Sequence, residues 1–121
     1  MPKKTILVID DEKRFAELLK LSLEQLPEYE GVVATTADEG LELVKTRRPD
    51  LILLDLRLPG HDGVELLKQI KATDAGIPVA MVTGVFSEEE ARRCFAAGAY
   101  DYITKPVDFD YLKRVLLVKL F

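Results

Sequence analysis

The stretch LILLD, residues 51–55, sets four apolar side chains in a row and ends on an aspartate. A strand with one solvent-facing side alternates apolar and polar residues, so an unbroken apolar run is typical of a strand covered on both faces. The run Ile6–Ile9 has the same character and ends on Asp10 and Asp11. Two such runs predict the buried strands of a parallel sheet with helices on both faces.

Outward from these runs, short apolar segments alternate five times with longer segments of helical spacing. No linker, repeat or low-complexity tract interrupts this rhythm, so residues 1–121 are predicted to form one α/β domain. The strands are expected at Thr5–Ile9, Val32–Thr36, Leu51–Leu54, Val79–Thr83 and Tyr102–Thr104.

The helices are marked by apolar residues at three- and four-residue steps and by capping residues at their ends. On the fourth helix, Ala91, Cys94 and Phe95 are expected to face the core. The expected helices are Phe15–Leu26, a second capped by Thr36 or Asp38, a third beginning at Gly63, a fourth between Ser87 and Gly98, and a fifth beginning near Asp108.

Composition excludes several functional classes. The formal net charge is −4 and no basic stripe is present, which argues against direct nucleic-acid binding by this domain. No apolar segment approaches the roughly 20 residues that a membrane span needs. The single cysteine, Cys94, has no partner for an internal disulfide, as is usual in a reducing compartment, so a cytoplasmic location is expected.

Four of the predicted strands end at residues whose side chains can bind a metal ion or take part in a reaction. Asp10 and Asp11 follow the first strand, Asp55 follows the third, Thr83 ends the fourth and Lys105 follows the fifth. The carboxyl ends of parallel strands lie along one edge of the sheet, where open α/β sheets form their ligand sites. We therefore expect these five side chains to converge, although each alone is also compatible with an ordinary cap, strand end or surface position.

Three converging carboxylates repel one another unless a cation lies between them. All-oxygen ligands favour Mg²⁺, or Mn²⁺, over zinc. His61 is nearby in sequence, but a lone imidazole beside a hard cation is better explained as a solvated side chain.

With a metal bound, one carboxylate can attack phosphorus and form an aspartyl phosphate. Asp55 is the best candidate nucleophile because it stands alone, whereas Asp10 and Asp11 form an adjacent pair suited to the metal. Lys105 and the hydroxyl of Thr83, with backbone N–H groups at 56–57 and 84, can then stabilise the negative phosphoryl oxygens.

Over essentially its whole length the chain resembles the receiver domains of two-component response regulators. The resemblance implies a flavodoxin-like (βα)5 fold, a three-layer sandwich with strand order 2-1-3-4-5. The matching motifs are VIDD at 8–11, DLRLPG at 55–60 with DG at 62–63, VTG at 82–84, AGA at 97–99 and YITKP at 102–106.

The resemblance also implies a role for each site residue. Asp55 would be the phosphoacceptor. Asp11, Asp55 and the backbone carbonyl of Arg57 would bind Mg²⁺ directly, with Asp10 acting through metal-bound water. Thr83 and Lys105 would contact the phosphoryl group.

Signalling would follow from these contacts. Tyr102 would turn inward as Thr83 moves, and the Lys105–Pro106 peptide would be cis. The phosphoryl group would come from a histidine kinase, a phosphotransfer protein or a small phosphodonor. It would switch the face formed by the fourth helix, fifth strand and fifth helix, which would act on an output domain or effector protein. Such a domain promotes only its own phosphorylation and dephosphorylation and is not otherwise an enzyme.

The last helix has more apolar residues than one buried stripe requires. Leu112, Val115 and Leu116 are expected to face the sheet. The remaining apolar residues predict contact with a second copy or an output domain, the alternative being an apolar terminal helix without a partner. These residues are Tyr111, Leu117, Val118 and Phe121.

Three other functional classes fit the sequence less well. A haloacid-dehalogenase-type phosphatase needs a second aspartate two residues after the nucleophile, where this chain has Arg57. A flavodoxin-like electron carrier needs a Ser/Thr-rich phosphate loop after the first strand, and none is present there. A pseudo-receiver without phosphoacceptor activity would lack part of the core residue set, and no member of that set is missing.

Overall fold

A five-stranded parallel sheet forms the centre of the molecule. The computed structural model describes residues 2–121, and its strands lie in the order β2-β1-β3-β6-β7. The sequence of sheet neighbours is the predicted 2-1-3-4-5, since β4 and β5 form a separate small hairpin. The strands are β1 (Lys4–Ile9), β2 (Tyr29–Ala34), β3 (Leu51–Leu54), β6 (Val79–Thr83) and β7 (Asp101–Thr104), with β4 (Arg57–Leu58) and β5 (His61–Asp62) in the hairpin.

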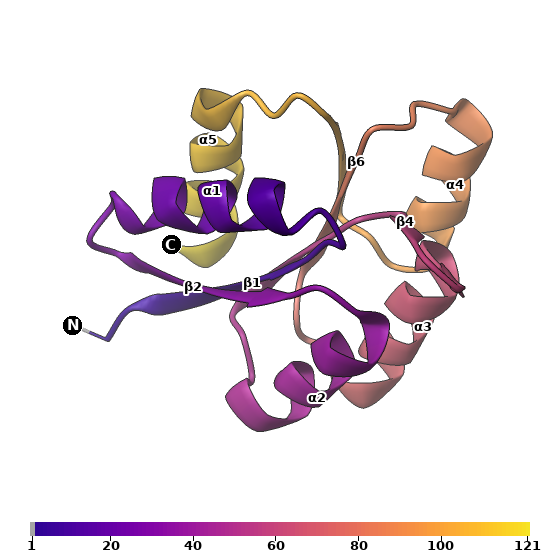
Figure 1. Cartoon of the computed structure of the whole chain (residues 1–121), viewed down its shortest axis with the longest axis horizontal. Coiled ribbons are helices and arrows are strands. Elements are labelled where there is room, and N and C mark those ends of the chain that lie inside the picture. Colours follow the sequence, from indigo (N-terminus) through magenta and orange to yellow (C-terminus); the bar gives the residue numbers. More distant parts are fainter. Residues whose placement is uncertain (1) are drawn as a thin grey trace.

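Helices cover both faces of this sheet (Figure 1). One face carries α1 and α5, and the other carries α2, α3 and α4. Within residues 2–121, no helix is long and apolar enough to cross a membrane. The helices are α1 (Lys13–Glu24), α2 (Ala37–Arg47), α3 (Gly63–Thr73), α4 (Glu88–Ala96) and α5 (Phe109–Leu120).

Two apolar clusters fill the space between the layers. Along β1, Leu7 and Ile9 belong to the cluster under α2, α3 and α4. Ile6 and Val8 belong to the cluster under α1 and α5. Successive side chains of a strand point to opposite faces, so a strand between two helical layers must be apolar at every position. This arrangement confirms the three-layer prediction.

The second strand lies earlier than predicted, at Tyr29–Ala34 rather than Val32–Thr36. The reason is local, because Thr36 leaves the sheet to become the N-cap of α2. Its side-chain oxygen accepts a hydrogen bond from the backbone N–H of Glu39 at 3.1 Å. Of the two caps considered for this helix, Thr36 is therefore the one used. The first helix also ends at Glu24, before the predicted Leu26.

The prediction for α4 was right at its start and wrong about one side chain. Ser87 is the N-cap, and Gly98 follows the helix with φ 109°, which a glycine adopts without strain. Cys94 is fully buried, whereas Phe95 is 48% exposed. Successive helical residues are about 100° apart, so the short α4 turns Phe95 away from the sheet when Cys94 faces it.

We expect Cys94 to be chemically inert in the folded protein. Burial raises the pKa of its thiol to about 11, so little thiolate is present at neutral pH. A thiol reagent should react with the native protein only as fast as the protein unfolds, and at once in denaturing urea. Rapid stoichiometric labelling under native conditions would contradict the packing described for α4.

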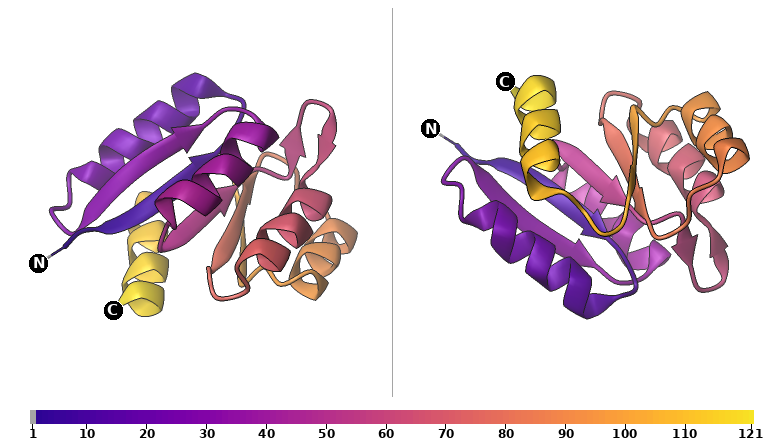
Figure 2. Two further views of the ribbon diagram at one scale, coloured as in Figure 1. Left: turned by 90° about the horizontal axis from the view of Figure 1, so that it is seen from below. Right: turned by 90° about the horizontal axis from the view of Figure 1, so that it is seen from above.

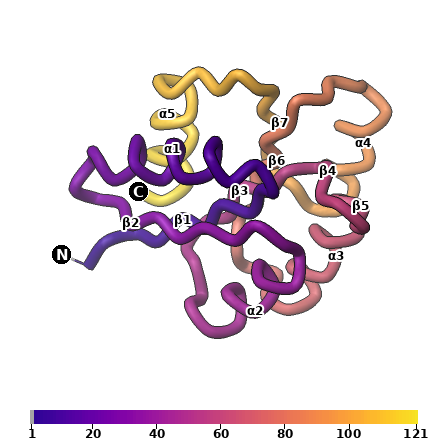
Figure 3. Tube along the Cα trace, viewed as in Figure 1, coloured from indigo at the N-terminus to yellow at the C-terminus, as the bar shows by residue number. Residues whose placement is uncertain are grey.

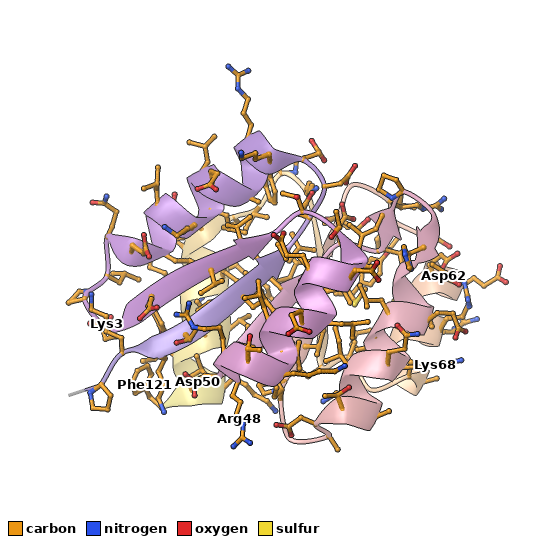
Figure 4. All side chains as sticks on the ribbon, turned by 60° about the horizontal axis from the view of Figure 1, so that its bottom comes forward. Lys3, Arg48, Asp50, Asp62, Lys68 and Phe121 are labelled. Atoms are coloured by element: carbon orange, nitrogen blue, oxygen red, sulfur yellow. The ribbon has the colours of Figure 1, made fainter. Side chains whose placement is uncertain are left out.

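Two of the three α5 residues expected to face the sheet are fully buried, Leu112 and Leu116. Val115 is only half-buried, and Leu120 packs against the core cluster instead. Figure 4 shows Phe121 at the end of the molecule opposite Asp62. The predicted contact of the exposed part of this helix with a second copy or an output domain stays a prediction. The exposed apolar residues of this segment are Tyr111, Leu117, Val118 and Phe121.

Candidate functional site

Three carboxylates meet at the carboxyl ends of β1 and β3. Figure 3 shows the chain leaving these strands at one edge of the sheet. One carboxylate oxygen from each of Asp10, Asp11 and Asp55 lies within 4.8 Å of the others. Asp10 is 2% exposed and Asp55 is 5% exposed, while Asp11 faces solvent. The predicted convergence of these three residues is confirmed.

Backbone hydrogen bonds extend the sheet into the site. The backbone N–H of Asp55 donates to the carbonyl of Ile9 at 2.9 Å, and that of Asp10 donates to Ala34 at 3.0 Å. Oδ1 of Asp55 accepts from the N–H of Arg57 at 3.1 Å. The carboxylates are therefore held by the sheet and by their own loops, before any ligand is bound.

Neither Asp10 nor Asp11 caps the first helix. The N-cap of α1 is Glu12, and no side-chain capping bond is formed there. Oδ1 of Asp10 instead accepts from the backbone N–H of Glu12 at 2.9 Å, which turns the chain out of β1. The alternative explanation of this acidic pair as ordinary helix caps is therefore excluded.

Lys105 lies among the carboxylates, after the end of β7. Its Nζ is 2.9 Å from Oδ2 of Asp10, 2.9 Å from Oε1 of Glu12 and 3.5 Å from Oδ2 of Asp55. The ammonium also lies 4.3 Å from the centre of the Phe15 ring, a cation–π distance. Neither Glu12 nor Phe15 was predicted from the sequence to belong to the site, although Glu12 directly follows the acidic pair.

The charges of the site alter the pKa values of its members. Burial raises the pKa of Asp10, and the hydrogen bond from Lys105 opposes this effect only in part. Burial lowers the pKa of Lys105, but the hydrogen bonds to Asp10 and Glu12 and the charge of Asp55 outweigh it. The net pKa of Lys105 is therefore well above its usual range, and the side chain stays cationic.

Thr83 and Tyr102 both contact the segment that follows β6. The fully buried Thr83 accepts, through Oγ1, a hydrogen bond from the N–H of Val85 at 3.3 Å. The half-buried Tyr102 donates its hydroxyl to the carbonyl of Val85 at 2.6 Å, with its ring against the core. The backbone N–H of Lys105 donates to the carbonyl of Thr83 at 2.8 Å, which ties β7 to β6. The Lys105–Pro106 peptide is cis, as predicted.

The loop after Asp55 folds into the β4–β5 hairpin, which was not predicted from the sequence. Arg57 pairs with Asp62 across the hairpin, which projects from the body of the molecule (Figure 2). Gly63 follows, and a Cβ atom there would lie 2.6 Å from Cα of Leu56, too close for any other residue. The predicted metal-binding carbonyl of Arg57 thus belongs to a well-defined turn, and His61 is exposed on it.

The donor set at this edge fits a hard divalent cation. It consists of carboxylate oxygens from Asp10, Asp11 and Asp55, with no histidine or cysteine in the group. Oxygen donors of this kind suit Mg²⁺ or Mn²⁺, whereas zinc prefers nitrogen and sulfur.

Residues 6–117 match the family model described as the response regulator receiver domain. The chain belongs to this family. The receiver is 39% identical over 108 residues to the phosphate regulon transcriptional regulatory protein PhoB of Pseudomonas aeruginosa, covering 88% of this chain and 47% of PhoB. It is 38% identical over 111 residues to the transcriptional regulatory protein ZraR of Escherichia coli, covering 92% of this chain and 25% of ZraR. The receiver thus spans less than half of either relative.

Solved structures agree with the receiver fold. The crystal structure of a CheY-like response regulator receiver domain protein from Methanospirillum hungatei superimposes with a TM-score of 0.89 at 36% sequence identity. The match covers 97% of this chain and 94% of that one. The receiver is therefore a regulatory phosphoacceptor domain of the two-component type, and the flavodoxin-like prediction is confirmed.

Proposed function

We propose that this receiver accepts a phosphoryl group on Asp55 in a Mg²⁺-dependent reaction. The observation that carries the proposal is the environment of Asp55, a buried carboxylate close to both the Asp10–Asp11 pair and the ammonium of Lys105. A nucleophilic carboxylate needs cationic groups around the phosphoryl oxygens that it attacks, and this edge of the sheet offers one ammonium and a site for one metal ion.

Each residue then has a distinct task. Asp11, Asp55 and the carbonyl of Arg57 would hold Mg²⁺ directly, and Asp10 would hold its water ligands. The metal supplies positive charge that makes the approach of a phosphoryl group to a carboxylate favourable. Lys105 would donate a hydrogen bond to the phosphoryl group, and it needs to move little because its Nζ is already 3.5 Å from Oδ2 of Asp55.

The signal would leave the site through Thr83 and Tyr102. A phosphoryl oxygen would accept a hydrogen bond from the Thr83 hydroxyl and draw it toward Asp55, away from the N–H of Val85 from which it now accepts. The hydroxyl of Tyr102 is bonded to the carbonyl of the same Val85, so a shift of this segment changes where Tyr102 can lie. Such differential contacts shift the populations of two pre-existing states.

The face that receives this change consists of α4, β7 and α5. On its two helices, Phe95, Tyr111 and Val118 are exposed apolar residues, which fits contact with an output domain, an effector protein or a second copy. The phosphodonor would be a histidine kinase, a phosphotransfer protein or a small phosphodonor in the cytoplasm. This chain itself would bind neither nucleic acid nor membrane.

The decisive experiment is incubation with acetyl phosphate and Mg²⁺, followed by intact mass spectrometry. We expect one phosphoryl adduct on the wild type, none on Asp55→Asn, and the wild-type result for Asp38→Asn, which changes an exposed aspartate on α2. EDTA should prevent the adduct. An adduct that persists in Asp55→Asn would refute the assignment, and sustained turnover of phosphate esters would favour a phosphatase.

A further inference from the structure

The ammonium of Lys105 is held more closely by Glu12 than by Asp55. The distances are 2.9 Å to Oε1 of Glu12 and 3.5 Å to Oδ2 of Asp55. Glu12 is outside the group of three carboxylates whose oxygens converge, and its side chain is 63% exposed. Lys105, by contrast, is only 14% exposed, so its possible partners are few.

A cation among the three aspartates would change which partner Lys105 keeps. Asp10 now shares Oδ2 with the ammonium at 2.9 Å, and a divalent ion beside this carboxylate would repel Lys105. Glu12 is not one of the three converging carboxylates, so its contact with the ammonium, at 2.9 Å, does not depend on an oxygen that the metal would take. The Phe15 ring, 4.3 Å away, favours a cation in this same place.

We propose that Glu12 is a positioning residue that holds the Lys105 ammonium at the rim of the site and competes with the phosphoryl group for it. This inference rests on the proposed phosphorylation of Asp55. Lys105 would divide its hydrogen bonds between Glu12 and the phosphoryl oxygens. Glu12 would therefore tune the strength of the contact between Lys105 and the phosphoryl group.

The first test follows Lys105 directly in the protein without metal or phosphoryl group. NMR of the lysine ε-methylene group reports its ion pairing, so Glu12→Gln should shift the Lys105 signal. Glu17→Gln, which removes the same charge farther along α1, should leave this signal in place. An unchanged Lys105 signal in Glu12→Gln would overturn the proposal, whatever the outcome at Asp55.

The second test measures the affinity for beryllofluoride, a phosphoryl analogue, in the presence of Mg²⁺. Because a partly exposed ion pair contributes little, we expect Glu12→Gln to bind the analogue only about three- to fivefold more tightly than wild type. In a Lys105→Met background, the same substitution should have no effect, since its target is missing. Such a double-mutant cycle separates an effect through Lys105 from the general loss of a negative charge.

The outcomes distinguish this inference from the proposed function. If the wild type takes neither a phosphoryl group nor beryllofluoride, the proposed function fails, although the NMR test of the Glu12–Lys105 contact still stands. If the wild type binds both and Glu12→Gln equals Glu17→Gln, the function holds and the role of Glu12 is refuted. A tighter affinity that persists in Lys105→Met would also refute it.

Discussion

Lys105→Met is expected to lower the free energy of unfolding of the metal-free protein by about 2–4 kcal/mol, because removing one member of a buried ion pair leaves the other charge without a partner. The carboxylate left without a partner is that of Asp10, since this residue is almost fully buried and its Oδ2 lies 2.9 Å from Nζ of Lys105. Methionine keeps most of the aliphatic stem but removes the ammonium, together with its ion pairs and its cation–π contact with Phe15, so the loss of stability is assigned to the missing charge.

Urea unfolding in EDTA measures this effect. Lys113→Met is the matched control, because its ion pair with Asp110 lies on the surface at 3.5 Å and should contribute less than about 1 kcal/mol. Asp10→Asn in the Lys105→Met background should recover most of the lost stability by removing the stranded charge. Equal stability of Lys105→Met and wild type would show that the ammonium has no structural role.

The layered fold could be predicted from the sequence because strands buried on both faces have an unmistakable pattern. The runs that end at Ile9 and Leu54 leave no polar side for solvent, and parallel topology then brings Asp10, Asp11, Asp55, Thr83 and Lys105 to one edge. Their convergence follows from strand polarity alone, without any knowledge of side-chain packing.

What the sequence did not reveal depends on local geometry. The β4–β5 hairpin has strands of only two residues, too short to leave a periodic pattern. Phe95 was predicted to be a core residue with Ala91 and Cys94, at three- and four-residue steps, and only the orientation of α4 decides that Cys94 is buried and Phe95 is not. The contact of Glu12 with Lys105 joins residues 93 positions apart and depends on where a flexible lysine comes to rest.

Asp55→Asn is expected to have two opposite effects on stability. It should stabilise the metal-free fold, and it should remove the stabilisation that Mg²⁺ gives to the wild type. Asp10, Glu12 and Asp55 place three carboxylates within 3.5 Å of the Lys105 ammonium, and Asp11 adds a fourth carboxylate to the cluster. Removing the buried charge of Asp55 should therefore raise the free energy of unfolding by about 1–2 kcal/mol, a part of the several kcal/mol that burying an ion costs. Asparagine can still accept the hydrogen bond from the N–H of Arg57, so the loop is preserved.

Unfolding with and without Mg²⁺ separates the two effects. At a Mg²⁺ concentration about 100 times its dissociation constant, the wild type should gain about 2.7 kcal/mol. Asp55→Asn should gain little, because one of the proposed metal ligands has lost its charge, and Asp38→Asn should behave like wild type in both buffers. A variant that is less stable than wild type without metal would mean that Lys105 already neutralises the cluster. If the variant is more stable, the buried carboxylate of Asp55 destabilises the metal-free fold. Such a cost is expected of a residue that serves a binding site, and it is not expected of a residue with only a structural role.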